Sequence, residues 1–300
     1  MKQLVILSGK GGTGKTSISA AFAELASQGE LKNNVVLADA DVDAANMELI
    51  LQPQVKEETE FKGGKLAIIN QDTCEQCGDC ETVCRFDAIH YLEGGYRVDQ
   101  IACDGCAACV YQCPTESIQM KEQVVGKFYF SESRYGPLYH ANLFPGQDNS
   151  GKLVTLVKQR ARLQALDENR QLVIVDGPPG IGCPVISATS GADLALIVAE
   201  PTVAGVHDMH RVLDTVSHFG VKALVCINKA DVYPEGTKEI EDFCQDNEIQ
   251  MAGKIPYDQS VTTAMVQGEP VTAFTPGAPS SIAIRQIWEQ VLHSLQPEES

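Results

Sequence analysis

Two runs of four cysteines with the same internal spacing constrain this chain more than any other feature. Both runs read C-x-x-C-x-x-C-x-x-x-C, and the second repeats the first after 29 positions. Their members are Cys74, Cys77, Cys80 and Cys84 in the first run and Cys103, Cys106, Cys109 and Cys113 in the second. A short segment that gathers so many thiols in two equal repeats is typical of a metal centre.

The spacing predicts two [4Fe–4S] clusters. It is the bacterial ferredoxin arrangement, in which the fourth cysteine of each run ligates the other cluster. Cluster 1 is expected to take Cys74, Cys77, Cys80 and Cys113. Cluster 2 is expected to take Cys84, Cys103, Cys106 and Cys109. Zinc is the alternative for any C-x-x-C pair, but this spacing suits zinc poorly. Arg85 follows the first run where Pro114 follows the second, so the local turns can differ.

A phosphate-binding loop opens the chain. Residues 9–16 fit G-x-x-x-x-G-K-[ST], between an apolar strand expected over 3–7 and a helix expected over 15–28. Backbone N–H groups of such a loop cradle phosphate oxygens, Lys15 would reach the β- and γ-phosphates, and the Thr16 hydroxyl would bind Mg²⁺. The predicted nucleotide contacts here are Gly11, Gly12, Thr13, Gly14, Lys15, Thr16 and Ser17.

Strand and helix patterns alternate on both sides of the cysteine segment. A second strand is expected at 35–38, and the alternation resumes at 172 and continues to a last helix over 280–295. This order predicts an α/β fold with a doubly wound, mostly parallel sheet. We expect one P-loop domain over 1–60 and 124–300, with a ferredoxin-like domain inserted over 61–123.

Lys10 points to a particular family. Residues 10–16 match K-G-G-x-G-K-[ST], and here the chain resembles the MinD/Mrp/ParA/nitrogenase-iron-protein class of P-loop ATPases, within the SIMIBI class. In that family the first lysine crosses a dimer interface to the partner's phosphates. The resemblance implies a homodimer across the nucleotide, with Lys10 as a second cation at the transferred phosphoryl group. With its insertion, the whole chain looks like MinD-superfamily ATPases that contain a ferredoxin domain.

Residues 39–46 resemble the first nucleotide-sensing loop of that family, switch I. The resemblance implies that Asp39 holds Mg²⁺ through water and that Asp41 positions the attacking water. Asp43 is a rival for the second role. The catalytic residues expected from the two loops together are Lys10, Lys15 and Asp41.

Residues 175–180 resemble switch II, at the end of an apolar strand. The resemblance implies that Asp176 binds Mg²⁺ and that Gly177 and Gly180 follow the γ-phosphate and move when it leaves. The expected Mg²⁺ residues are therefore Thr16, Asp39 and Asp176.

Residues 228–231 read N-K-x-D after another strand. In GTPases such an aspartate selects guanine, whereas the family resemblance favours ATP, with Asn228, Asp231 and Pro256 near the base. GTP stays open at this point. Glu200-Pro201-Thr202, which ends the preceding strand, also looks like the family.

Composition and charge limit the partners and the compartment expected for this protein. The net charge of −17 argues against nucleic-acid binding, which needs a basic face. The sequence contains no apolar stretch long enough to span a membrane and no signal peptide, so we expect a cytoplasmic protein.

Three functions fit the sequence. The first is an ATP-gated electron carrier with an unknown redox partner. The second is an iron–sulfur carrier that loads an apo-protein, as in Mrp-type ATPases. The third is a spatial organiser like MinD, which would lie on a membrane through a basic C-terminal helix. Residues 281–295 are amphipathic but contain one arginine, so we expect them to dock on the core.

Three cysteines lie outside the two runs. Cys183 follows Asp176 at the offset where the nitrogenase iron protein carries a cluster ligand, but a small buried thiol is the expectation favoured here. Cys226 and Cys244 are expected in the core.

Overall fold

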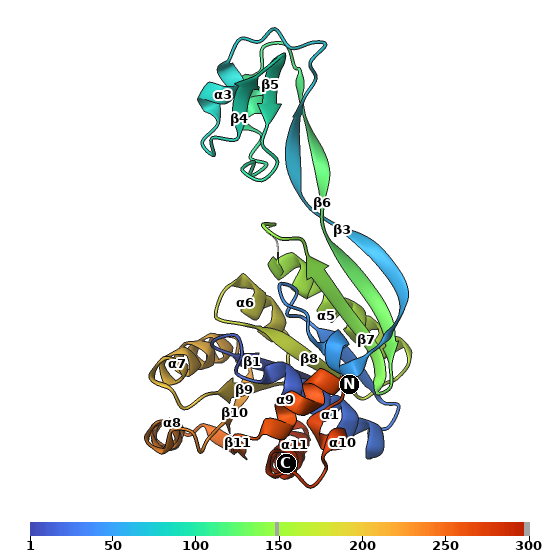
Figure 1. Cartoon of the computed structure of the whole chain (residues 1–300), viewed down its shortest axis with the longest axis vertical. Coiled ribbons are helices and arrows are strands. Elements are labelled where there is room, and N and C mark those ends of the chain that lie inside the picture. Colours follow the sequence, from blue (N-terminus) through green and yellow to red (C-terminus); the bar gives the residue numbers. More distant parts are fainter. Residues whose placement is uncertain (148–149, 297–300) are drawn as a thin grey trace. The chain divides into compact units, whose positions relative to one another are not determined.

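The computed structural model describes residues 1–147 and 150–296. The chain divides into two compact units (Figure 1). The larger unit comprises Met1–Glu58, Phe128–Asn142 and Ser150–Ser300, and the cysteine-rich unit comprises Thr59–Lys127 and Leu143–Asn149.

A nine-stranded sheet has the order β11-β10-β9-β1-β8-β2-β7-β6-β3. Its strands are β1 (Lys2–Ser8), β2 (Val35–Asp39), β3 (Gln54–Ile69), β6 (Ile118–Ser133), β7 (Gly136–Leu143), β8 (Leu172–Pro179), β9 (Leu194–Ala199), β10 (Lys222–Asn228) and β11 (Gln250–Ile255). Every pairing from β11 across to β7 is parallel. The predicted mostly parallel α/β sheet is confirmed.

Helices cover both faces of this sheet. Leu4 and Ile6 of β1 belong to one core with helices α1 and α11, while Val5 and Leu7, equally buried, point to the opposite face because side chains alternate along a strand. The helices of the larger unit are α1 (Lys15–Gln28), α2 (Met47–Leu51), α5 (Ser150–Asp167), α6 (Cys183–Thr189), α7 (Val203–His218), α8 (Pro234–Asp246), α9 (Gln259–Gln267), α10 (Val271–Phe274) and α11 (Pro279–Leu295).

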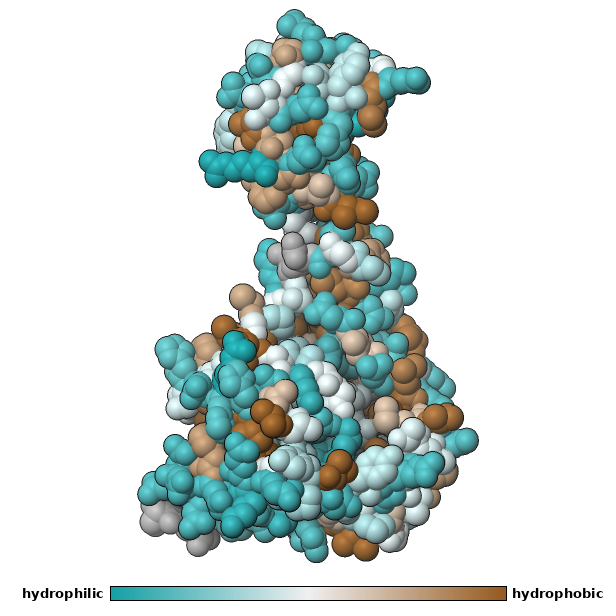
Figure 2. Space-filling view, turned by 60° about the vertical axis from the view of Figure 1, so that its left-hand side comes forward, coloured by the Kyte–Doolittle hydropathy of each residue, from teal (hydrophilic) through white to brown (hydrophobic). Residues whose placement is uncertain are grey.

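Helix α11 packs on the core, as predicted. Ile284, Ile287 and Trp288 on its apolar side are buried, and the Trp288 ring lies 4.8 Å from the Phe22 ring of α1, centroid to centroid. This apolar side is therefore not available to a membrane surface. Among residues 1–147 and 150–296, no helix is long and apolar enough to cross a membrane. The face of the larger unit seen in Figure 2 is mostly hydrophilic, with scattered apolar side chains.

Lys158 of α5 is a buried cation whose ammonium group contacts backbone carbonyl oxygens. Its Nζ donates hydrogen bonds to the carbonyl oxygens of Ser187, Ala188 and Ser190, which lie at the carboxyl end of α6. Helix ends carry unsatisfied carbonyl groups and partial negative charge, so an ammonium group there is stabilising.

We expect Lys158→Met to lower the free energy of unfolding by about 3 kcal/mol, because it leaves buried carbonyl groups without donors. Urea denaturation followed by circular dichroism measures the change. Lys152→Met is the matched control, since Lys152 lies exposed on the same helix. Equal stability of both variants would contradict the assigned role.

The cysteine-rich unit contains a two-stranded antiparallel sheet, β4 (Ile89–Leu92) with β5 (Gly95–Val98). Two short helices contact each other there, α3 (Asp79–Val83) and α4 (Ala108–Gln112). Its apolar core includes Ile89, Tyr96 and Ile118 together with cysteines of both runs. The thiols therefore contribute to the core of this unit.

Candidate functional site

The phosphate-binding loop lies between β1 and α1 and packs closely against β10 and α7. Gly14 adopts φ 96° at the start of α1, and a Cβ there would lie 2.4 Å from Nδ2 of Asn228. A Cβ on Gly9 would lie 2.2 Å from Cβ of Asp208 on α7. These two positions need glycine because of close approach, and at Gly14 also because of its left-handed backbone.

Three carboxylates and one lysine meet at the carboxyl ends of adjacent strands. Asp39 of β2 and Asp176 of β8 are register partners and both are fully buried. Lys15 is also buried, and its Nζ lies 4.0 Å from Oδ2 of Asp41. Parallel strands place their carboxyl ends at one edge, which is why residues distant in sequence converge here.

The pKa values of these acids reflect the lack of surrounding water. Burial, reinforced by the neighbouring Asp176, raises the pKa of Asp39 well above its usual value. Burial also raises the pKa of Asp176, although Lys15 and hydrogen bonds from the Thr16 and Ser19 hydroxyls act in the opposite direction. Oδ2 of Asp176 has no hydrogen-bond partner among the described residues. An unpaired buried carboxylate oxygen beside a second carboxylate suits a divalent cation.

The loop after β2 separates its acidic residues. The Asp39 carboxylate accepts hydrogen bonds from the backbone N–H groups of Asp41, at 3.2 Å, and Met47, at 3.0 Å, and so closes the loop. Asp41 is buried beside Lys15, and burial raises its pKa to about 6 despite that lysine. Asp43 is exposed. The geometry thus brings Asp41, and not Asp43, to the phosphate loop.

The second switch segment packs closely against β1. A Cβ on Gly177 would lie 2.7 Å from the carbonyl oxygen of Ile6, and the Gly180 N–H donates to the carbonyl oxygen of Ser8 at 2.9 Å. Gly180 has φ 91°, and a Cβ added there would meet nothing within 4 Å, so it is the freer of the two glycines.

The residues predicted near the base lie together. Nδ2 of Asn228 donates to the carbonyl oxygen of Thr13 at 2.7 Å, which ties β10 to the phosphate loop. Oδ1 of Asp231 accepts from the Tyr257 N–H at 2.6 Å, next to half-buried Pro256. One Asp231 oxygen is thus already engaged by the backbone. The Ser17 hydroxyl contacts Sδ of Met265 at 3.2 Å.

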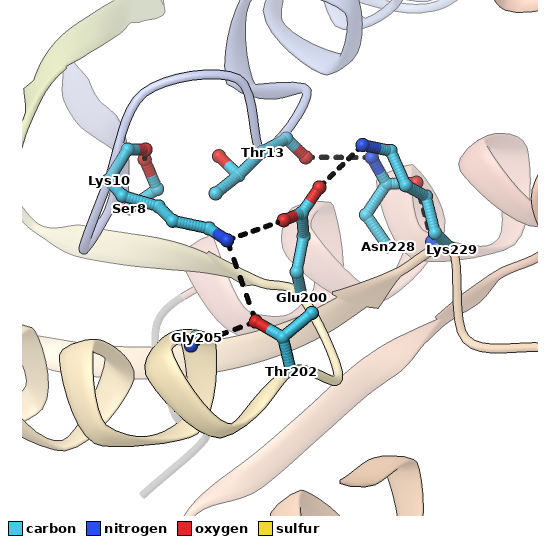
Figure 3. A network of polar contacts seen from close by, with 8 residues as sticks. All are labelled: Ser8, Lys10, Thr13, Glu200, Thr202, Gly205, Asn228 and Lys229. Carbon is cyan, nitrogen blue, oxygen red and sulfur yellow. Dashed lines mark hydrogen bonds and ion pairs between the residues drawn. The ribbon is translucent and has the colours of Figure 1, made fainter. Parts of the chain in front are cut away.

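Lys10 is held within its own subunit by a network that the sequence did not predict (Figure 3). Its Nζ lies 2.9 Å from Oε2 of Glu200, whose Oε1 lies 2.5 Å from Nζ of Lys229. Burial acts to raise the pKa of Glu200, but hydrogen bonds from Lys229 and Lys10 outweigh it and lower that pKa. The sequence did not predict this network because Lys10, Glu200 and Lys229 lie on three loops that are far apart along the chain.

The two cysteine runs have the same backbone conformation. Left-handed residues occur at equivalent positions, 29 apart, in three pairs: Gln76 with Gly105, Gly78 with Ala107, and Asp87 with Glu116. Such turns direct successive backbone N–H groups to one side, an arrangement that binds anions and iron–sulfur clusters. The sequence repeat is therefore also a structural repeat.

Thiols from both runs converge around Cys109. Burial raises the pKa of this thiol, and the neighbouring thiols of Cys103, Cys106 and Cys84 raise it further. A small cavity is lined by the same four cysteines with Phe86 and Met120. Cys84 comes from the first run and the other three from the second, which is the predicted composition of cluster 2.

The other four cysteines show the same pattern of exposure, with one buried, two half-buried and one exposed. Burial raises the pKa of Cys80 to about 11, and Cys74 and Cys77 contribute to this rise. Cys113 packs against the same apolar core, and its Sγ accepts a hydrogen bond from the Ser117 N–H at 3.3 Å. Its pKa is lowered by the bonds that it accepts, although burial opposes them.

All eleven cysteines are free thiols. Among residues 1–147 and 150–296, no three His, Cys, Asp or Glu side chains are arranged to hold one metal ion. A [4Fe–4S] cluster is larger than a single ion, and each of its four cysteines binds a different iron atom. Cysteines that hold such a cluster therefore surround it and do not converge on one point.

The remaining cysteines differ in exposure. Cys226 and Cys244 are buried, as predicted. The prediction that Cys183 is a small buried thiol is wrong, because Cys183 is exposed at the first turn of α6, after Gly182.

Comparisons with known proteins agree with this geometry. Residues 4–271 match the family described as CobQ/CobB/MinD/ParA nucleotide binding domain. The uncharacterised protein MJ0578 of Methanocaldococcus jannaschii is 39% identical over 228 residues, 76% of this chain and 78% of that protein. The septum site-determining protein MinD of Bacillus subtilis is 25% identical over 300 residues, 98% of this chain and 90% of MinD.

A solved structure shares the fold. The structure of the MinC:MinD cell division protein complex of Aquifex aeolicus contains a chain with a TM-score of 0.59 and 19% identity, covering 100% of this chain and 99% of that chain. The phosphate-binding loop, the buried acids beside it and the family match support one assignment. This chain belongs to the CobQ/CobB/MinD/ParA nucleotide-binding family and is a P-loop ATPase of the MinD/ParA type.

Proposed function

We propose that this protein is an ATP-driven molecular switch in which two copies close on Mg²⁺ and ATP and separate after hydrolysis. The observation that carries the proposal is the buried group formed by Lys15, Asp41, Asp39 and Asp176 at one sheet edge. Lys10 of each copy would reach the phosphates held by the other. The engaged oxygen of Asp231 supports ATP over GTP.

Each residue of the site has a proposed role. The unpaired Asp176 oxygen, the Thr16 hydroxyl and Asp39 through water fit Mg²⁺, which would neutralise charge on the β- and γ-phosphates. Lys15 holds the same phosphates, and Asp41, already beside it, positions the attacking water. Gly180 is free to follow the γ-phosphate.

The named relatives favour a MinD-like switch over the electron carrier that the sequence put first. MinD of Bacillus subtilis is a septum site-determining protein, and the Aquifex MinD fold belongs to a complex with MinC. We therefore put first a switch whose dimer binds a protein partner. Membrane attachment through α11 is not part of the proposal, because the apolar side of this helix packs on the core.

A second candidate function comes from the cysteine-rich unit. Two equal repeats, left-handed turns at equivalent positions and the grouping of Cys84 with three thiols of the other run support two [4Fe–4S] clusters. In that case the ATP-dependent dimer would gate electron transfer to a redox partner. Transfer of a cluster to an apo-protein is the alternative.

Anaerobic purification with analysis of iron and acid-labile sulfide, followed by EPR and light scattering with and without a non-hydrolysable ATP analogue, separates these functions. Dimerisation with ATP supports the switch, and a protein that stays single contradicts it. Iron whose EPR signal changes with nucleotide supports gated electron transfer. Zinc, or no metal, in oxygen-free protein contradicts the cluster proposal and leaves the switch standing.

A further inference from the structure

Glu200 holds two lysines from two different loops. It directly follows β9, its side chain is 11% exposed, and its two oxygens contact Nζ of Lys10 and Nζ of Lys229 separately. Lys10 also lies 3.5 Å from Oγ1 of Thr202. Figure 3 shows the carboxylate between the two ammonium groups. The contact ties the phosphate loop to the loop after β10.

The Glu200 side of this contact is fixed by packing. A Cβ on Gly205 would lie 2.3 Å from the carbonyl oxygen of Glu200, so α7 starts directly against this residue. Thr202 caps the same helix by accepting a hydrogen bond from the Gly205 N–H at 3.0 Å. Lys229 has φ 57°, a conformation that a lysine adopts only when its surroundings hold it. The Lys10 and Lys229 side chains are about equally exposed, at 36% and 37%, but Lys10 lies on a glycine-rich loop and is therefore the partner that can leave.

Charge balance makes this departure feasible. Removing one partner from a largely buried ion pair normally leaves an uncompensated charge, which is costly. Here Lys229 stays with Glu200 when Lys10 moves, so the carboxylate keeps a cation. The contact is therefore strong enough to hold Lys10 and weak enough to be exchanged for phosphate oxygens.

We propose that Glu200 is a positioning residue that holds Lys10 in the single subunit and releases it only to the triphosphate of a second copy. This inference rests on the proposed ATP-dependent dimer. Lys10 must lose its Glu200 contact before it can reach a partner's phosphates, so Glu200 raises the concentration of ATP at which dimers form. The contact would keep subunits apart at low ATP.

The test has a readout in the single subunit and one in the dimer. In nucleotide-free, dilute protein, Glu200→Gln should increase the rate at which Lys10 is acetylated by acetic anhydride, measured by mass spectrometry, with Lys254 as the internal reference lysine. Light scattering should show half-maximal dimerisation at about threefold to tenfold lower ATP, the effect of losing one partly exposed ion pair. Glu200→Asp, which keeps the charge, should lie closer to the wild type.

The Lys10→Ala background shows whether the effect passes through Lys10. There, Lys10→Ala by itself should abolish ATP-dependent dimerisation, and Glu200→Gln should not restore it. Unchanged Lys10 acetylation, or dimerisation at equal or higher ATP in the Glu200→Gln variant, would overturn the inference. If wild-type protein forms no dimer but Lys10 acetylation rises as expected, the hold on Lys10 stands and the proposed switch fails.

Discussion

Lys10→Ala is expected to reduce ATP hydrolysis roughly 10³-fold while ATP still binds the single subunit. A cation supplied across an interface to the transferred phosphoryl group contributes factors of about this size. Binding should survive because Lys15 and the loop N–H groups stay in place, whereas ATP-dependent dimerisation should be lost. Phosphate release and a fluorescent ATP analogue measure the two effects separately.

Three controls test whether the effect is specific to Lys10 and whether Lys10 acts on the site of the partner subunit. Lys254→Ala removes a lysine from another ion pair, with Glu241 at 2.7 Å, and should leave hydrolysis unchanged. Lys15→Ala should lose ATP binding itself. Mixing Lys10→Ala with Asp41→Ala protein should restore some hydrolysis, because a mixed dimer contains one site with Asp41 and a lysine from the partner. No restored activity, or a Lys10→Ala variant that hydrolyses ATP normally, would show that Lys10 does not act in trans.

If the cysteine-rich unit holds the two proposed [4Fe–4S] clusters, Cys109→Ala should remove one of them and lower iron from about eight to about four atoms per chain in oxygen-free protein. Cys109 lies buried where Cys84, Cys103 and Cys106 converge, so its loss opens one corner of that group. Anaerobic iron and sulfide analysis with EPR measures the result. Cys84→Ala should affect the same cluster as Cys109→Ala, although the two residues belong to different runs.

Two variants serve as matched comparisons for Cys109. Cys80, its equivalent in the first run, is equally buried, and Cys80→Ala should remove the other cluster. Cys244→Ala changes a buried cysteine of the larger unit and should leave iron unchanged. If Cys84→Ala resembles Cys80→Ala in its EPR signal, each run serves its own cluster and the crossed ligation is wrong. Protein without iron removes the basis of this prediction altogether.

Sequence reasoning was strongest where chemistry is local. The glycines and lysines of residues 9–16, the apolar strands and the equal cysteine runs each lie within a few turns of chain, and the structure has strands and helices where the patterns predicted them. The 16-residue strand β3, by contrast, was not predicted. Its first half, residues 54–60, is exposed and charged and shows no apolar alternation. Pairing within the sheet, and not local preference, makes it a strand.

By itself the sequence determined the parallel α/β framework, the nucleotide loop and the repeat of cysteines, because these depend on residue type and spacing along the chain. The tertiary structure decided that Asp41 and not Asp43 lies beside Lys15, that Asp231 is bonded to the backbone of Tyr257, and that Glu200 holds Lys10 and Lys229. These contacts join loops that are far apart in sequence. Their distances follow from strand order and helix packing, which only the folded chain establishes.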